Sequence, residues 1–253
     1  MMSTIRIWRD RSTQAASAAL AGLLIAAYPC QANVDRLDQR VLRVGTAGSS
    51  GTAFILGPDS NGRCILLTAH HVIAVNSSTE PLEITGPGGR VMTLLPGAFR
   101  SDPSLDLAFS PVSSCQHSLS LPLARARAIT VSTKVMIKGY PLADEGTEIP
   151  GSSPSTVSGR ISQYNDADGY DLSYDAATRP GYSGGPVIHA DGSELMAMHG
   201  RTDSAGNSED PEQRERLRVG GKGVSAPLIY RFLKANGHVL PRSQRAICLV
   251  GVC

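Results

Sequence analysis

Hydrophobic residues in this chain form short runs, many of them rich in β-branched residues, and Gly, Pro, Asn and Asp separate the runs. This pattern is typical of strands that are joined by turns. The predicted strands are Thr52–Leu56, Cys64–Thr68, Arg90–Leu95, Asp106–Val112, Lys134–Lys138, Ser158–Ser162, Gly169–Tyr174, Pro186–His189 and Glu194–Met198. We therefore expect an all-β protein.

One segment near the end of the chain has helical periodicity instead. The apolar residues of Pro227–Asn236 fall on one face of a helix, and Gly237 follows as a stop signal. The polar stretch Thr202–Gly223, which is dense in Glu and Arg, is predicted to be an exposed loop. The apolar residues of the predicted helix are Leu228, Ile229, Phe232 and Leu233.

The first 32 residues have the pattern of an export signal. A basic segment ends at Arg11, the apolar run Ala15–Ala27 follows, and Cys30-Gln31-Ala32 places small residues where a signal peptidase would cut. The apolar run is shorter than the ~20 residues that a membrane-spanning helix needs. We expect a signal peptide over residues 1–32, a mature chain that begins at Asn33 without a membrane anchor, and a periplasmic or secreted location.

The composition of the 253 residues, 41% hydrophobic and 18% charged, is that of a globular chain with a sizeable core. The net charge is +2, but three basic residues and one acidic residue lie in residues 1–32. Without them, 24 basic and 22 acidic residues become 21 and 21, so the mature chain is neutral. This balance does not favour the electrostatic attraction that dominates nucleic-acid binding, and nucleic acid is not expected as a partner.

The cysteines also agree with export. When Cys30 leaves with the signal, an even number remains in a chain bound for an oxidising compartment. Several pairings are open, of which we favour two disulfides: Cys64 with Cys115, joining two strands of one sheet, and Cys248 with Cys253, closing a short loop. The sequence has no Cys or His spacing of a zinc site, so neither a metal nor another cofactor is predicted.

The most specific motif is Pro180-Gly181-Tyr182-Ser183-Gly184-Gly185-Pro186. A serine hydroxyl attacks a carbonyl only when a base takes its proton and when hydrogen-bond donors face the developing oxyanion. The flanking glycines allow a sharp turn, so the N–H groups of Gly181 and Ser183 could point into one oxyanion hole. Ser183 is therefore the candidate nucleophile, although a simple Gly/Ser-rich turn would have a similar sequence.

A candidate base lies in Leu66-Leu67-Thr68-Ala69-His70-His71-Val72, at the end of an apolar strand. Neighbouring residues of a strand point to opposite faces, so only one of His70 and His71 is expected to face Ser183.

A candidate carboxylate lies in Leu105-Asp106-Leu107-Ala108-Phe109, within a predicted apolar strand. A buried charge needs a partner, and an imidazole N–H that must be oriented is a suitable one. Asp102, in Ser101-Asp102-Pro103, has the pattern of a cap or turn residue.

The three segments together resemble the trypsin/chymotrypsin-like serine peptidases, whose triad has the order His, Asp, Ser. The chain has T-A-x-H before a hydrophobic residue, then D-L-A, then G-x-S-G-G-P, and the resemblance covers roughly Gly48 to Gly237. On the family pattern the catalytic histidine is the fourth residue of T-A-x-H, which favours His71 over His70.

The resemblance implies a fold and a reaction. It implies two packed antiparallel six-stranded β-barrels with a C-terminal helix, over residues 33–127 and 128–253, and a triad of His71, Asp106 and Ser183 between them. The expected activity is that of an exported, cofactor-free serine endopeptidase, expected to be monomeric, whose substrate is a polypeptide.

Within the family, the chain is most similar to bacterial glutamyl endopeptidases and periplasmic heat-shock proteases. In the former, a His on the pocket strand and a Thr shortly before the nucleophile hold an acidic substrate side chain, and His199 and Thr178 lie at matching places. The resemblance therefore implies acidic preference before the cut bond, with small apolar residues as the alternative. The matching segments are Lys138-Gly139-Tyr140-Pro141, Ser158-Gly159-Arg160-Ile161, Tyr170-Asp171-Leu172-Ser173 and, for the heat-shock proteases, Asp175-Ala176-Ala177-Thr178-Arg179-Pro180-Gly181.

One departure from the family concerns Tyr182. Digestive members have Asp before the serine, where it pairs with a new N-terminal amine and locks the oxyanion loop. That ion pair cannot form with Tyr182, so we expect packing or Pro180 to shape the loop.

Two other functions fit parts of the sequence. Gly181-Tyr182-Ser183-Gly184-Gly185 also satisfies the G-x-S-x-G motif of α/β-hydrolase esterases, but that fold needs a helix directly after the serine and alternating strands and helices. The second alternative is a peptide-binding module on the chymotrypsin-like fold that is catalytically silent.

Overall fold

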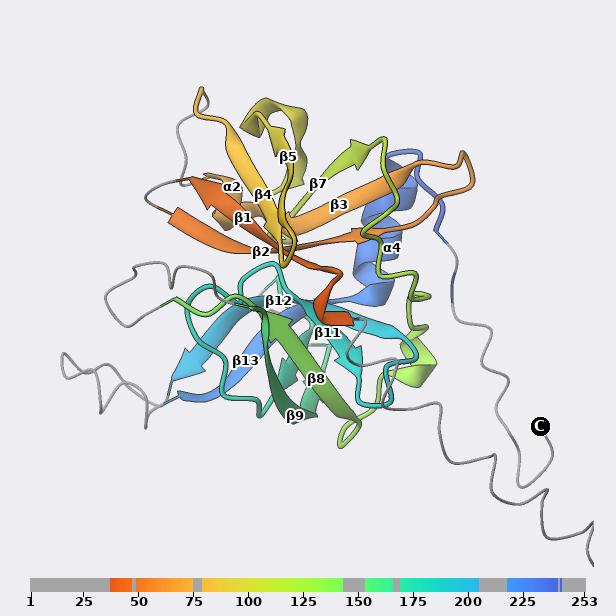
Figure 1. Ribbon diagram of the computed structural model, residues 1–253. Coiled ribbons are helices and arrows are strands. Elements are labelled where there is room, and N and C mark those ends of the chain that lie inside the picture. Colours follow the sequence, from red (N-terminus) through yellow and green to blue (C-terminus); the bar gives the residue numbers. More distant parts are fainter. Residues whose placement is uncertain are drawn as a thin grey trace, which may run out of the picture.

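The computed structural model describes residues 37–46, 49–74, 79–142, 153–165, 169–204, 218–240 and 242. Two antiparallel β-structures, one above the other in Figure 1, make up most of this part of the chain. The all-β prediction is therefore confirmed, and the architecture is the chymotrypsin-like double barrel. The predicted signal peptide and the second predicted disulfide lie outside the described residues.

The first half of the chain forms one seven-stranded sheet with the order β5-β4-β1-β2-β3-β7-β6. This sheet is the first of the two expected barrels, and it is a half-barrel of seven strands where six were expected. Among the described residues β5 and β6 end the sheet without pairing with each other, and β6 contributes only three residues. The strands are β1 (Val41–Thr46), β2 (Ser49–Leu56), β3 (Cys64–Ala69), β4 (Leu82–Gly86), β5 (Gly89–Leu94), β6 (Arg100–Asp102) and β7 (Leu107–Val112).

The second half forms the closed six-stranded barrel that was expected, with the order β10-β13-β12-β11-β8-β9. Its strands are β8 (Lys134–Gly139), β9 (Ser155–Tyr164), β10 (Leu172–Tyr174), β11 (Pro186–His189), β12 (Leu195–Ser204) and β13 (Arg218–Ser225). The boundary between residues 127 and 128 remains a prediction.

The predicted loop Thr202–Gly223 is wrong at both ends, because β12 continues to Ser204 and β13 begins at Arg218. β13 was not predicted because of its glycine content. A Cβ on Gly220 would lie 2.4 Å from the Tyr174 carbonyl oxygen, and one on Gly223 would lie 2.6 Å from that of Met198, so this strand packs where larger residues could not. Residues 205–217 lie outside the described part.

The helix prediction is confirmed as α4 (Ala226–Ala235), which Gly237 follows with a left-handed φ of 84°. The apolar face of α4 buries Ile229 and Leu233. Phe232 packs edge-on against Phe109 of β7, with ring centroids 5.5 Å apart, so α4 also contacts the first sheet (Figure 1). The shorter helices are α2 (His70–Ala74), η1 (Pro96–Ala98) and η2 (Ala126–Ala128), and no helix of the described residues is long and apolar enough to cross a membrane.

The predicted disulfide between Cys64 and Cys115 is present. Cys64 begins β3, as expected, but Cys115 lies just beyond the end of β7 rather than in a strand. The disulfide therefore ties the segment that leaves the first sheet back to β3.

Candidate active site

His71 lies on α2 rather than on a strand. The sequence analysis placed His70 and His71 at the end of a strand, but β3 ends at Ala69 and α2 begins at His70. The argument from strand alternation was therefore wrong, although the preference for His71 over His70 agrees with the geometry. Nδ1 of His71 lies 2.8 Å from Oδ2 of Asp106, and its backbone N–H donates to Oδ1 at 2.9 Å.

Asp106 had been expected within a strand, but it lies in the turn before β7. Its φ of 52° is left-handed, a conformation that few non-glycine residues adopt. The carbonyl of Asp106 accepts the N–H of His70 at 3.1 Å, which joins this turn to the start of α2. Asp102 caps the same turn, as predicted, because Oδ1 accepts the backbone N–H groups of Ser104 and Leu105.

The environment of Asp106 favours its charged form. Burial acts to raise the pKa of Asp106, but hydrogen bonds from His71 and Tyr170, together with the charge of His71, lower it below the ordinary value. A carboxylate that is ionised and paired in this way can orient an imidazole ring and stabilise its protonated form.

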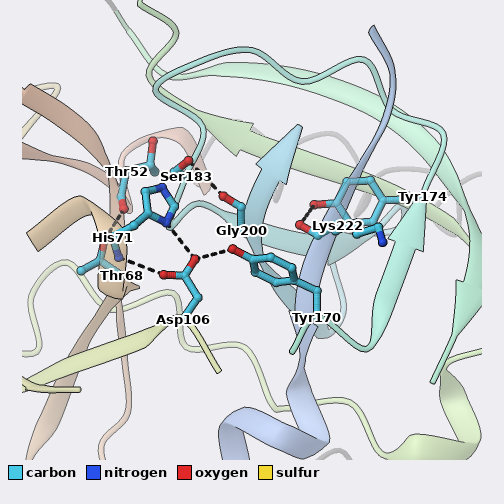
Figure 2. A network of polar contacts seen from close by, with 9 residues as sticks. All are labelled: Thr52, Thr68, His71, Asp106, Tyr170, Tyr174, Ser183, Gly200 and Lys222. Atoms are coloured by element: carbon cyan, nitrogen blue, oxygen red, sulfur yellow. Dashed lines mark hydrogen bonds and ion pairs between the residues drawn. The ribbon is translucent and has the colours of Figure 1, made fainter. Parts of the chain in front are cut away.

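Ser183 lies beside this pair. In Figure 2 the His71 ring lies between Asp106 and Ser183, so the ring nitrogen that does not contact Asp106 faces the serine. The Ser183 hydroxyl donates to the carbonyl of Gly200 at 3.0 Å. The three residues that the motifs singled out in separate parts of the sequence thus lie in one place.

The loop that carries Ser183 is tied to β2 through Thr52. The Thr52 N–H donates to the carbonyl of Ser183 at 2.8 Å, and its hydroxyl donates to the carbonyl of Gly181 at 2.6 Å. The same hydroxyl accepts the N–H of Tyr140 at 3.0 Å. One buried threonine of the first sheet therefore holds the nucleophile loop of the second barrel.

The backbone that carries the predicted oxyanion donors forms a tight turn before Ser183. The Tyr182 N–H donates to the carbonyl of Arg179 at 3.2 Å, with Pro180 and Gly181 at the corners of the turn and Gly181 at φ 93°. The Pro180 carbonyl accepts the N–H of Leu142 at 2.9 Å. In a trans peptide the N–H points opposite to the carbonyl, so the N–H of Gly181 points away from Leu142.

The N–H groups of Gly181 and Ser183 have no hydrogen-bond partner among the described residues. Both N–H groups lie on the loop that carries the Ser183 hydroxyl, and an oxyanion hole requires unpaired donors near the nucleophile.

Tyr182 is buried and packs the loop onto the barrel. A Cβ on Gly139 would lie 2.7 Å from Cδ1 of Tyr182, so the ring lies directly on the end of β8. The Tyr182 hydroxyl hydrogen-bonds to Ser155, and its ring packs edge-on against His199 with centroids 6.5 Å apart. These contacts agree with the expectation that packing shapes the loop.

His199 and Thr178, the two residues expected to bind substrate, are both buried and lie close together. A Cβ on Gly221 would lie 2.9 Å from Cε1 of His199 and 3.2 Å from Oγ1 of Thr178. Nδ1 of His199 hydrogen-bonds to the Tyr174 hydroxyl, whereas Nε2 has no partner among the described residues. Burial, with the charge of His71 adding to it, lowers the pKa of His199 to about 3, so its ring is neutral at ordinary pH.

Tyr170 is a site residue that sequence analysis missed. Its hydroxyl donates to Oδ2 of Asp106 at 2.7 Å (Figure 2). The sequence contained Tyr170 in a segment of the family resemblance, but no spacing rule connects it with a carboxylate 64 residues away. The described residues contain no cluster of three or more His, Cys, Asp or Glu side chains that could hold a metal ion.

Comparison with known families decides the class of this site. A model of the trypsin-like peptidase domain matches residues 51–198, which include the segments of His71 and Asp106 and the Ser183 loop. The chain belongs to the trypsin-like peptidase family. The α/β-hydrolase alternative does not fit, because the strands of both sheets pair antiparallel and no alternation of strands and helices occurs in the described residues.

Solved structures show the same fold. The active form of the Rv3671c protease from M. tuberculosis is 18% identical, with 83% of this chain and 86% of that chain covered and a TM-score of 0.59. The HtrA-type protease AlgW with a tripeptide is 23% identical, with 83% and 65% covered and a TM-score of 0.58. The serine endoprotease from Yersinia pestis is 19% identical, with 80% and 64% covered and a TM-score of 0.60. No curated protein matches the sequence of this peptidase.

Proposed function

We propose that this trypsin-like peptidase is an exported serine endopeptidase that uses His71, Asp106 and Ser183 as its triad. The observation that carries the proposal is the 2.8 Å contact between Nδ1 of His71 and Oδ2 of Asp106, on the side of the ring opposite Ser183. This contact leaves Nε2 of His71 as the nitrogen that faces the serine hydroxyl. A base held by a carboxylate in this way is the arrangement that activates a serine.

The first chemical step is attack on the substrate carbonyl. The Ser183 hydroxyl, which donates to the Gly200 carbonyl, rotates toward Nε2 of His71 and transfers its proton there as Oγ bonds to the carbonyl carbon. The charge that develops on the carbonyl oxygen accepts hydrogen bonds from the N–H groups of Gly181 and Ser183. Asp106 remains ionised and stabilises the imidazolium.

The second half of the reaction returns the enzyme to its starting state. The imidazolium gives its proton to the leaving amine as the peptide C–N bond breaks, which leaves an acyl group on Ser183. Water loses a proton to His71 as it attacks the ester. The imidazolium then gives that proton to Oγ of Ser183 as the ester C–O bond breaks and the acid leaves. No metal ion or cofactor takes part in this sequence.

A serine-directed fluorophosphonate probe, together with peptide hydrolysis, tests the proposal. The wild-type chain should react with the probe and cleave peptides, while Ser183→Ala should not react and should lose turnover by ~10³-fold or more. The folded state of Ser183→Ala is checked by urea unfolding. Equal peptide cleavage by wild type and Ser183→Ala would exclude Ser183 as the nucleophile, and a folded wild type that neither reacts nor cleaves would favour the peptide-binding module.

The proposed substrate preference is an acidic residue before the cut bond. Its support is the buried Nε2 of His199, which has no partner among the described residues, and the neighbouring hydroxyl of Thr178. The Tyr174 hydroxyl has two acceptors, Nδ1 of His199 and, at 3.3 Å, the Lys222 carbonyl. When its proton goes to Nδ1, the closer of the two, Nε2 carries the ring proton and can donate to a substrate carboxylate without the ring becoming charged.

A peptide library that varies the residue before the cut tests this preference. The wild type should favour Glu or Asp, and Thr178→Val and His199→Gln should each reduce that preference while cleavage elsewhere continues. A wild-type preference for Ala or Val at this position would favour the small apolar pocket instead.

The export proposal is supported by the disulfide between Cys64 and Cys115, which needs an oxidising compartment to persist. Fractionation of cells that express the full chain should recover it outside the cytoplasm, with Asn33 at its N-terminus. Size-exclusion chromatography of that mature chain should give a monomer.

A further inference from the structure

Tyr170 connects the second barrel with the carboxylate of the first sheet. It lies shortly before β10, and its hydroxyl donates to Oδ2 of Asp106 at 2.7 Å. Nδ1 of His71 contacts the same oxygen at 2.8 Å, and the His71 N–H donates to Oδ1 at 2.9 Å. Figure 2 shows the Tyr170 hydroxyl and the His71 ring meeting at this one carboxylate.

The strand next to Tyr170 leaves room for its ring only because residue 200 is glycine. A Cβ on Gly200 would lie 2.0 Å from Cε1, 2.7 Å from Cζ and 2.8 Å from Cδ1 of Tyr170. Real carbon atoms do not approach so closely, so any larger residue at position 200 would displace the ring. Gly200 is also the residue whose carbonyl accepts the Ser183 hydroxyl.

The ring has a further contact that orders it. The guanidinium of Arg201 lies 5.4 Å from the centroid of the Tyr170 ring, within the range of a cation–π interaction. The Tyr170 ring is therefore in contact with two consecutive residues of β12, the backbone of Gly200 and the guanidinium of Arg201.

We propose that Tyr170 is a positioning residue that fixes the Asp106 carboxylate against His71, and that Gly200 is required to make room for it. This inference rests on the proposed peptidase function of the same site. Without the Tyr170 donor, the carboxylate would be held only by the ring and the backbone N–H of His71. With the donor, Oδ2 is also held from the second barrel, so the position of the carboxylate does not depend on His71 alone.

The hydroxyl also moderates the charge of Asp106. A hydrogen bond to a carboxylate oxygen stabilises the negative charge and so weakens the pull of that oxygen on a neighbouring imidazolium. Without the hydroxyl, the imidazolium form of His71 should be favoured, and His71 should accept its proton at higher pH. Burial, then the hydrogen bond to Asp106, raises the pKa of Tyr170, so the hydroxyl keeps its proton and remains a donor.

Of the residues that the structure describes, His199 and Arg201 are the other titratable or charged groups found to act on this cluster. His199 is neutral at ordinary pH, because burial and the charge of His71 lower its pKa to about 3. Arg201 keeps its positive charge throughout.

The first test is Tyr170→Phe, which removes the hydroxyl and keeps the ring. We expect kcat to fall about 10-fold with little change in KM, and the acid limb of the pH–rate profile to move about half a pH unit upward. A purely structural role would lower the active fraction without moving that limb. Tyr230→Phe, on α4, is the matched control and should change neither quantity.

A second readout does not depend on turnover. The titration midpoint of the His71 ring protons, followed by NMR in the folded chain, should move upward in Tyr170→Phe relative to wild type and Tyr230→Phe. An unchanged midpoint would overturn the positioning role. If the wild type cleaves no peptide, the proposed function fails, but this measurement still decides the role of Tyr170.

The requirement for glycine is tested by a double-mutant cycle. Gly200→Ala should lower kcat at least as much as Tyr170→Phe. In a Tyr170→Ala background, where the space is empty, the same Gly200→Ala change should cost much less. Additive losses would show that Gly200 does not act through Tyr170 and would overturn that part of the inference.

Discussion

The two halves of the candidate site are held by different kinds of interaction. On the first sheet, the Asp106 carboxylate accepts hydrogen bonds from the ring and the backbone of His71. On the second barrel, the Ser183 loop is shaped by left-handed glycines, with Gly181 and Gly184 at φ 93° and 84°, and by packing of the buried Tyr182 ring.

Because of this difference, substitutions in the two halves should impair the site in different ways. A substitution of the Asp106 carboxylate can leave the positions of the other atoms unchanged and still change which nitrogen of the His71 ring carries the proton. A substitution in the loop can leave all three proposed triad residues present and still move the proposed oxyanion donors. The two kinds of damage should be distinguishable, because only the second should lower the stability of the fold.

The largest effect is expected for Asp106→Asn. The amide has nearly the size of the carboxylate but cannot stabilise an imidazolium, and kcat should fall by about 10⁴-fold. Peptide hydrolysis measures the loss, and urea unfolding should show little change in stability.

Asp102→Asn is the matched control, because Asp102 only caps the turn that leads to Asp106. It should cost less than about 10-fold in kcat. Similar losses for the two variants would contradict the separate roles of these carboxylates.

The next effect concerns the shape of the loop. A Cβ on Gly184 would lie 2.1 Å from the carbonyl oxygen of Thr52 and 2.4 Å from Oγ1 of Thr68, and the left-handed φ adds strain. Gly184→Ala should lower the free energy of unfolding by about 3 kcal/mol or more and should also lower kcat.

Gly62→Ala separates the two causes, because Gly62 has a φ of 75° but nothing lies within 4 Å of an added Cβ. It should cost only about 1 kcal/mol and leave kcat unchanged. Equal losses in Gly62→Ala and Gly184→Ala would show that strain, rather than the contact with Thr52, dominates.

A smaller effect is expected from pH. The pKa of His199 is about 3 in the folded state, against an ordinary value of 6.5, so the unfolded state takes up the proton first as the pH falls. The free energy of unfolding should therefore fall below pH 6.5, by about 2 kcal/mol at pH 5 from this group. Urea unfolding between pH 7 and 5 measures the slope. His199→Gln should flatten it and His117→Gln should not, so equal slopes in His199→Gln and wild type would contradict the assignment.

The smallest effect is expected for residues added ahead of Asn33. Because contacts of Tyr182 hold the oxyanion loop, the loop does not depend on a free N-terminal amine, and kcat should stay within about twofold of the unextended chain. Complete inactivity of a folded, extended protein would contradict this account of the loop.

The sequence predicted chemistry better than it predicted backbone conformation. The three motifs around His71, Asp106 and Ser183 were found because the residues next to each one in the sequence fit its chemical role. Glycines flank the serine, and apolar segments flank the histidine and the aspartate. The predicted conformations of two of them were wrong: His71 lies in the first turn of a helix, and Asp106 lies in a turn with a left-handed φ. Both depend on hydrogen bonds between segments about 35 residues apart, which local patterns do not contain.

Two other features were missed for a similar reason. β13 has little hydrophobic periodicity, because its glycines are selected by the Tyr174 and Met198 carbonyls against which they pack. Tyr170 reaches Asp106 from the other half of the chain, through space that Gly200 leaves empty. In both cases the deciding partner is distant in sequence.

The burial of Tyr182 has a consequence for when proteolysis can begin. The uncharged Tyr182 ring, packed in the barrel, gives the loop its shape. The loop therefore does not need a new N-terminal amine, released by a cut in the precursor, to reach that shape. Under the proposed function, catalytic competence would arrive together with the folded state. The moment and the place of folding, rather than a cut in the precursor, would then decide which polypeptides the enzyme meets first.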